Sequence, residues 1–307
     1  MRPIFCGLAA FLYSWTAAWP AGLVTDVRAA IAHNDFAAAE RLTRESLAKG
    51  TTPEGVLALS WLSRGALAAK QLDKADAYAS ETRNLSLKLL RTRKMDDESS
   101  LPTAFGAYME VHAQVLAARG QVADAVEFLQ QQLETYGNTS LPERIQKNIN
   151  LLSLEGKPAP PLEEAVWLGA KSPALDSLRG HPVLLFFWAH WCPDCKAEAP
   201  VIAGLQKTFG PKGLVVISPT KLYGYVNRGD EARPEAEKPY IEQVRAHYYS
   251  AMGDMSVPVS SRNFQVYGVS TTPTLVLVDR SGVVRTYHPG NLTNEELTAQ
   301  IQTLLSR

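Results

Sequence analysis

The chain has 307 residues, which exceeds one typical domain and predicts two. Lysine plus arginine and aspartate plus glutamate each number 31, so the formal net charge is zero. This balance gives no overall field to attract nucleic acid or an anionic membrane surface, and we expect neither as a partner.

The amino-terminal segment, residues 1–21, has the pattern of an export signal. Arg2 precedes a short apolar stretch, and small residues lead to a cleavage position after Ala18. An uncleaved membrane anchor is the alternative, because no charge occurs between Arg2 and Asp26, although Pro20 interrupts a helix there. We therefore expect a periplasmic or otherwise extracytoplasmic protein, either released or held by this segment.

Residues 22–154 are expected to form an all-α domain, because the segment is rich in alanine and leucine and its apolar residues recur at helical spacing. Three stretches place a turn-like residue five positions before an alanine, as tetratricopeptide (TPR) repeats do: Asn34–Glu40, Lys70–Ala75 and Gly120–Leu129. The alanines lie 36 and 50 positions apart, an irregular spacing, so an unrelated antiparallel helical bundle is the alternative to a TPR-like domain. Either form would bind a protein partner or position its neighbour.

The stretch 156–161, Gly-Lys-Pro-Ala-Pro-Pro, breaks helix and resembles a linker, so we place a domain boundary before it. Residues 155–307 predict an α/β domain. Its expected elements are strands over 183–189 and 214–218, helices over 192–209 (bent at Pro200), 237–249 and 294–305, and a hairpin of 274–279 with 283–287. Thr293 and Glu296 form a capping box for the last helix.

The second domain is organised around an apolar strand that runs into Cys192-Pro193-Asp194-Cys195 and then into helix-forming residues. A helix that begins at Cys192 directs its unpaired N–H groups and its positive dipole end at that sulfur, which favours the thiolate. Cys195 lies about one turn deeper on the same face, where it can attack a mixed disulfide at Cys192. We expect Cys192 to be the exposed sulfur. Pro193 suits the first helical position because its missing N–H would have had no partner.

A structural zinc site is the alternative use of such a pair, but it needs four ligands. The only other cysteine is Cys6, and no His-x₃₋₅-His pair occurs among the six histidines. We therefore expect no metal and no dissociable cofactor. Removal of residues 1–21 would leave the pair as the only cysteines, which suits a protein that exchanges disulfides with others.

The run from 156–160 through 178–183 to 187–195 resembles the TlpA/ResA branch of the thioredoxin-like proteins, and Thr271-Thr272-Pro273-Thr274 resembles that family's cis-proline loop. The resemblance covers residues 155–307. It implies a thioredoxin-like fold and a thiol–disulfide oxidoreductase, in which Pro273 is cis and the backbone of Thr272 pairs with the substrate. It also implies disulfide-bearing exported proteins as substrates and a membrane thiol as electron donor.

Glu198 matches an acidic residue that, in ResA-like proteins, lies near the dithiol and assists proton movement; a solvated helix glutamate is the alternative. Phe186 stands where thioredoxin carries a buried aspartate. Without that aspartate, Glu198 or water would have to accept the proton of Cys195.

Other residues of the motif are candidates for tuning the dithiol or contacting the substrate. A protonated His190 would favour the thiolate, whereas the Asp194 carboxylate would oppose it. Pro193 belongs to the same tuning group, and Trp191 is expected at the rim of the substrate site.

The 81 positions from Cys192 to Pro273 exceed the roughly 30 residues that one βαβ unit needs. The excess lies in 219–258, which either shapes a substrate groove or is a tolerated surface insertion. We predict an exported oxidoreductase that reduces disulfides of particular proteins, because the resemblance to TlpA- and ResA-like proteins implies this direction. Asp194 adds a weaker argument, since its carboxylate disfavours the strongly stabilised thiolate of an oxidant. The alternative is a protein-binding scaffold whose thioredoxin-like half only docks.

Overall fold

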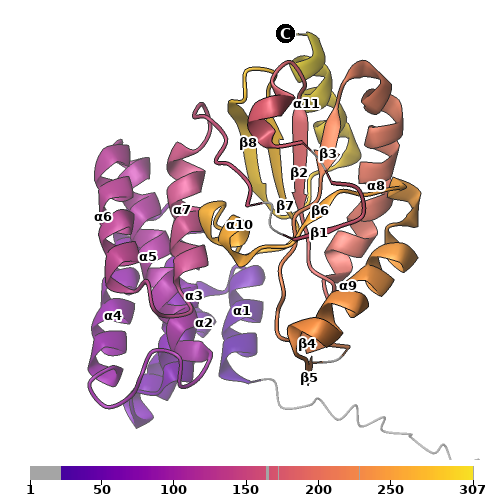
Figure 1. Ribbon diagram of the computed structural model, residues 1–307. Coiled ribbons are helices and arrows are strands. Elements are labelled where there is room, and N and C mark those ends of the chain that lie inside the picture. Colours follow the sequence, from indigo (N-terminus) through magenta and orange to yellow (C-terminus); the bar gives the residue numbers. More distant parts are fainter. Residues whose placement is uncertain (1–21, 164–165, 172, 228, 307) are drawn as a thin grey trace, which may run out of the picture.

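The protein is seen here as a computed structural model, which describes residues 22–163, 166–171, 173–227 and 229–306. The expected signal or anchor, residues 1–21, lies outside the described residues. Within these ranges, no helix combines the length and apolar character needed to cross a membrane. An all-α half is followed by an α/β half beside it (Figure 1), which confirms the expected fold class.

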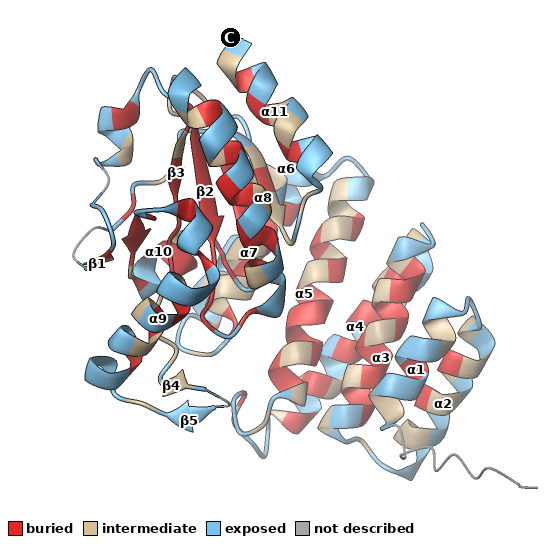
Figure 2. Ribbon diagram, turned by 90° about the vertical axis from the view of Figure 1, so that its right-hand side faces the viewer, coloured by how far each residue is buried: buried red, intermediate tan, exposed pale blue. Residues whose placement is uncertain are grey.

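The all-α half consists of paired helices. The pairs are α1 (Leu23–Ala32) with α2 (Phe36–Lys49), α3 (Pro53–Ala68) with α4 (Leu72–Leu89), and α5 (Ser100–Ala118) with α6 (Val122–Thr135); α7 (Pro142–Ser153) follows. Helices α3 and α5 pack against neighbours on both sides, so most of their residues are buried (Figure 2).

The turns inside the three pairs have the same geometry. In each, one residue takes the left-handed conformation, with φ of 59°, 58° and 85° at Asn34, Lys70 and Gly120. The N–H of that residue bonds to the carbonyl three positions earlier, and the next N–H bonds to the carbonyl five positions before it. The alanine five positions later is fully buried in every case: Ala39, Ala75 and Ala125. Alanine at this position lets the two helices of a pair approach closely.

The α/β half is built on a four-stranded sheet in the described residues, with strand order β3-β2-β7-β8. Strand β2 (Val183–Phe187) runs parallel to β3 (Val215–Ile217) and antiparallel to β7 (Thr274–Val278), which pairs with β8 (Val284–Pro289). All five residues of β2 are buried, because helices cover both faces of the sheet (Figure 2). The helices are α8 (Pro193–Phe209), α9 (Pro234–Tyr248), α10 (Ser261–Val266) and α11 (Asn294–Ser306).

Smaller elements connect these parts. Strand β1 (Trp167–Leu168) pairs with β6 (Val257–Pro258), and β4 (Tyr225–Val226) pairs with β5 (Asp230–Glu231). Short 3₁₀ helices span Leu175–Leu178, Gly210–Lys212 and Ser250–Met252.

The expected elements of the α/β half are confirmed with shifted ends. Helix α9 begins at Pro234 rather than at 237, since proline is accommodated in the first turn. The capping box is present: the N–H of Glu296 donates to Thr293 Oγ1 at 3.2 Å, and the N–H of Thr293 donates to Glu296 Oε2 at 2.9 Å. The linker-like stretch is held along β8, because the N–H of Val284 donates to the carbonyl of Lys157 at 2.9 Å.

The two halves contact each other through α7. Asn150 Nδ2 donates to the carbonyl of Val266, at the end of α10, at 3.2 Å. Glu143 Oε1 lies 2.5 Å from Lys221 Nζ, in the chain that follows β3. Helix α7 therefore joins the helical half to the segments that follow β3 and precede β7.

Candidate functional site

The dithiol segment leaves the sheet at the end of β2 and is fixed by the chain that follows β3. The indole Nε1–H of Trp188 donates to the carbonyl of Ser218 at 2.9 Å, and the hydroxyl of Thr220 donates to the carbonyl of Trp188 at 2.8 Å. The Trp188 ring is fully buried, with its centroid 4.6 Å from that of Tyr249. The N–H of Cys192 then donates to the carbonyl of Ala189 at 3.1 Å, which closes a turn just before α8.

Cys192 and Cys195 form a disulfide at the start of α8. Cys192 is the N-cap residue, and its sulfur accepts the backbone N–H of Cys195 at 3.0 Å. Pro193 occupies the first helical position. The sulfur of Cys192 therefore lies at the positive end of the helix dipole, where a thiolate is favoured.

Exposure does not distinguish the two cysteines. Cys192 is 1% exposed and Cys195 is 0% exposed, so the expectation of an exposed Cys192 is wrong for the disulfide form. The physical reason is the cis-proline loop, whose Thr272 carbonyl oxygen lies 3.5 Å from the Cys192 sulfur. The sulfurs differ instead in hydrogen bonding and in their position along α8.

The loop that covers the disulfide contains a cis peptide bond between Thr272 and Pro273. The carbonyl of Pro273 accepts the N–H of Gly290 at 2.8 Å, and the hydroxyl of Thr274 donates to the carbonyl of Thr271 at 2.7 Å. These bonds hold the loop beside the dithiol, directly before the first residue of β7.

Glu198 lies on α8, about one turn beyond Cys195, and is 6% exposed. Its Oε1 is enclosed and has no hydrogen-bond partner among the described residues. Burial raises the pKa of this carboxyl. The alternative of a solvated helix glutamate is therefore wrong.

The remaining predicted residues divide between surface and interior. Asp194 is exposed, and Trp191, 42% exposed, contacts the ring of Tyr223 edge-on at 5.6 Å between centroids. His190 points inward, and its side chain is 0% exposed. Burial lowers the pKa of His190, although a neighbouring carboxylate, that of Glu237, acts in the opposite direction.

That carboxylate belongs to a residue the sequence analysis missed. Glu237 is completely buried within the 219–258 segment, and its Oε1 lies 3.4 Å from His190 Nε2. It also accepts the backbone N–H groups of Tyr223 at 2.5 Å and Gly224 at 2.8 Å. No local spacing links positions 190 and 237; the only sequence signal is the concentration of tyrosines in this segment. Among the described residues, no cluster of three or more His, Cys, Asp or Glu side chains is arranged to hold a metal ion.

Comparison with known proteins agrees with this geometry. Residues 156–287 match the AhpC/TSA family. The thioredoxin-like protein YneN of Bacillus subtilis (strain 168) is 31% identical over 150 residues, which cover 48% of this chain and 78% of that protein. DsbE, a thiol:disulfide interchange protein of Pseudomonas fluorescens biotype C, is 30% identical over 159 residues, which cover 49% and 77%.

A third relative, the thiol-disulfide oxidoreductase ResA of Geobacillus thermodenitrificans (strain NG80-2), is 25% identical over 130 residues, which cover 42% of this chain and 67% of ResA. The matched region is the α/β half, which carries the disulfide and the cis-proline loop. The chain therefore belongs to the thioredoxin-like family of thiol–disulfide oxidoreductases.

Proposed function

We propose that this oxidoreductase is exported and reduces disulfides of particular extracytoplasmic proteins. The observation that carries the proposal is the Cys192–Cys195 disulfide at the start of α8, with the Thr272 carbonyl 3.5 Å from the Cys192 sulfur. A reactive sulfur at a helix start and a peptide edge beside it are together suited to binding a protein chain and exchanging its disulfide.

The reaction proceeds in two exchanges. The Cys192 thiolate attacks one sulfur of the substrate disulfide, which forms a mixed disulfide and releases the other substrate sulfur as a thiolate that takes a proton. Cys195 then loses its proton and attacks the Cys192 sulfur, which releases the second substrate thiol and forms the Cys192–Cys195 disulfide. Two electrons pass to the substrate, and a membrane thiol donor restores the dithiol.

Other side chains support these steps. The enclosed Glu198 carboxylate takes the proton of Cys195, because it lies about one turn along the same helix. Thr272 and Pro273 present the backbone edge to the substrate, and the exposed Trp191 ring packs on it. Pro193, Asp194 and His190 adjust the stability of the Cys192 thiolate.

The chain is organised as residues 1–21, a signal or anchor; 22–154, a TPR-like domain; and 155–307, the redox domain. The repeated turn at Asn34, Lys70 and Gly120 supports the assignment as TPR-like. Export to the periplasm follows from the residue pattern of 1–21.

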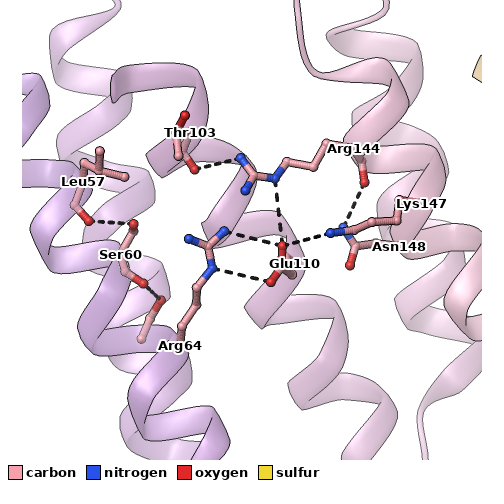
Figure 3. A network of polar contacts seen from close by, with 9 residues as sticks. Leu57, Ser60, Arg64, Thr103, Glu110, Arg144, Lys147 and Asn148 are labelled. Atoms are coloured by element: carbon pink, nitrogen blue, oxygen red, sulfur yellow. Dashed lines mark hydrogen bonds and ion pairs between the residues drawn. The ribbon is translucent and has the colours of Figure 1, made fainter. Parts of the chain in front are cut away.

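The helical half binds a protein partner through a groove between α3, α4 and α5, next to a charged cluster that α7 completes. There Glu110 lies among three cations (Figure 3), with Arg64 Nε at 3.4 Å, Lys147 Nζ at 3.7 Å and Arg144 Nε at 3.9 Å. Although burial opposes ionisation, the cations hold the pKa of Glu110 below its usual value. A groove of about 680 Å³ adjoins this cluster, lined by Arg64, Leu67, Ala68, Lys70, Leu72, Glu110, Gln114 and Ala118. Apolar grooves are one of the surfaces through which proteins bind peptides.

Two measurements test the proposal. Reduction of insulin by the protein with a thiol donor separates an enzyme from a scaffold, because a scaffold would show no turnover that depends on Cys192. Equilibration with glutathione tests the direction: a potential near the thioredoxin value of about −270 mV supports a reductant, and one near the DsbA value of about −120 mV would refute it.

A further inference from the structure

His190, two positions before Cys192, forms a buried pair with Glu237, a residue that has no part in the exchange steps above. The side chains are 0% and 1% exposed, and Nε2 lies 3.4 Å from Oε1. Among the described residues, neither ring nitrogen of His190 has a hydrogen-bond partner. Burying an imidazole is costly unless a partner such as the Glu237 carboxylate compensates, so the pairing requires an explanation beyond packing.

The 219–258 segment supplies the surroundings of this pair. The rings of Tyr223, Tyr225 and Tyr240 contact the imidazole edge-on, with centroids at 5.5, 5.3 and 5.4 Å. Glu237 is fixed at the same time, because it accepts the N–H groups of Tyr223 and Gly224. The segment therefore encloses the residue two positions before Cys192, which is inconsistent with a merely tolerated surface insertion.

The enclosure extends to the dithiol turn. The carbonyl of Ala189 accepts the N–H of Cys192, so His190 and Trp191 form the middle of a closed turn. Tyr223 contacts the rings of both His190 and Trp191. A change in the His190–Glu237 pair is therefore transmitted to the turn that carries the reactive sulfur.

Charge gives the pair a second connection to the dithiol. The groups that face His190 are the carboxylate of Glu237 on α9, the ammonium of Lys196 on α8 and the three tyrosines. Burial and Lys196 disfavour a protonated imidazole, and Glu237 favours it. Reduction of the disulfide adds a negative charge at Cys192, and this charge also favours a protonated His190.

We propose that Glu237, acting through His190, is a positioning residue for exchange: the pair holds the turn before Cys192 and couples the protonation of His190 to reduction of the dithiol. When a dithiol donor supplies two electrons and two protons, Cys195 takes one proton, Cys192 becomes the thiolate, and His190 takes the other proton. The inference rests on the proposed exchange function. It means that the 219–258 segment influences the equilibrium between the disulfide and the reduced dithiol.

Titration of His190 by NMR in the oxidised and reduced full-length protein tests the coupling directly. We expect His190 to bind its proton about tenfold more tightly in the reduced protein. In reduced Cys192→Ser, which cannot form the thiolate, the affinity should return to that of the oxidised protein. Equal proton affinity in the two redox states of the wild type would overturn the proposal, whatever the variants do.

Glu237→Gln and its matched control Glu235→Gln, an exposed residue on the same helix, test the role of the carboxylate. Glu237→Gln should lower the proton affinity of His190 about tenfold and shift the thiolate titration of Cys192, followed by ultraviolet absorbance, whereas Glu235→Gln should change neither by more than about twofold. A purely structural role would lower thermal stability and leave both titrations unchanged, which would overturn the proposal. Insulin reduction by the wild type is measured alongside; its absence would refute the proposed function, a result distinct from failure of the coupling.

Discussion

At the scale of single residues, the two cysteines are equally buried, and their hydrogen bonds distinguish them. The sulfur of Cys192 accepts the N–H of Cys195 and lies at the helix start, whereas Cys195 lies within the first turn. Negative charge is therefore better stabilised on Cys192 than on Cys195. The same difference assigns attack to the first sulfur and resolution to the second.

Replacement of either cysteine tests that assignment. Cys192→Ser should abolish insulin reduction, whereas Cys195→Ser should retain attack and accumulate the mixed disulfide, because no second thiol can release the substrate. Non-reducing electrophoresis with mass spectrometry would identify the adduct. If a limiting amount of alkylating reagent modified Cys195 before Cys192 in the reduced wild type, the assignment of Cys192 as the attacking sulfur would be wrong.

Glu198→Gln should slow the resolving step without lowering stability at neutral pH. Burial raises the pKa of Glu198, so the folded protein holds this proton more tightly than the unfolded chain does. The ionised carboxylate therefore costs stability above the raised pKa, and the cost vanishes below the unfolded value. Gln removes that cost but also removes the proton acceptor.

Single-turnover release of substrate from the mixed disulfide, measured against pH, checks the role of Glu198. The wild-type rate should rise as the pH passes through the raised pKa, and Glu198→Gln should lose this limb. Loss of unfolding free energy in urea at neutral pH, with an unchanged pH profile, would show that Glu198 is structural.

These residues also show how far the sequence predicts the site. Cys192, Cys195 and Pro273 were predicted because a local motif identifies each of them. The burial of Glu198 and the inward orientation of His190 depend on which face of the domain is covered. Glu237 was not predicted, because its contact with His190 joins positions that only the folded α9 brings together.

At the scale of elements, the hairpin between β7 and β8 depends on one carboxylate. Asp279 Oδ1 accepts the N–H groups of Ser281 at 2.9 Å and Val283 at 3.0 Å, and Oδ2 accepts Arg285 Nε at 2.6 Å. The hydroxyl of Ser281 also donates to Oδ1, at 2.6 Å. Burial alone would raise the pKa of Asp279, but the hydrogen bonds, that of the Ser281 hydroxyl above all, lower it to about 2. The Arg280-Ser281-Gly282 stretch predicted this turn in the sequence, whereas the short strands β1, β4, β5 and β6 lack any such local signal.

Asp279→Asn should therefore lower stability at neutral pH by about 1–2 kcal/mol, discounted for partial solvent exposure. The depressed pKa means that this stabilisation is present above the unfolded value of about 3.9 and is lost as the pH falls from there through about 2. Urea unfolding at pH values across this window measures the difference. If the unfolding free energies of the wild type and Asp279→Asn differed by the same amount at the acidic and neutral ends of this window, the Asp279 carboxylate would not be the source of the stabilisation.

At the scale of the whole molecule, the position of the helical half is set by the close approach of α7 to the chain between α10 and β7. Gly268 has a φ of 60°, and a Cβ at this position would overlap the backbone of Gln146 and Lys147. Asn150, on α7, adds a hydrogen bond to the carbonyl of Val266, two positions before Gly268. Because Gly268 lies four positions before Thr272, docking of α7 and the geometry of the cis-proline loop are parts of one structure.

Gly268→Ala tests this close approach, and Gly120→Ala is its matched control, because both glycines end a helix with the same pair of turn hydrogen bonds. Both have a positive φ, 60° and 85°, so an alanine at either incurs the left-handed backbone penalty of about 1 kcal/mol, but a Cβ on Gly120 meets nothing within 4 Å. At Gly268 the methyl group must also displace α7, which adds about 1–3 kcal/mol. Urea unfolding should therefore show a larger loss for Gly268→Ala, accompanied by slower insulin reduction because the displacement reaches Thr272. Equal losses of stability for the two variants would mean that α7 does not approach Gly268 closely in solution.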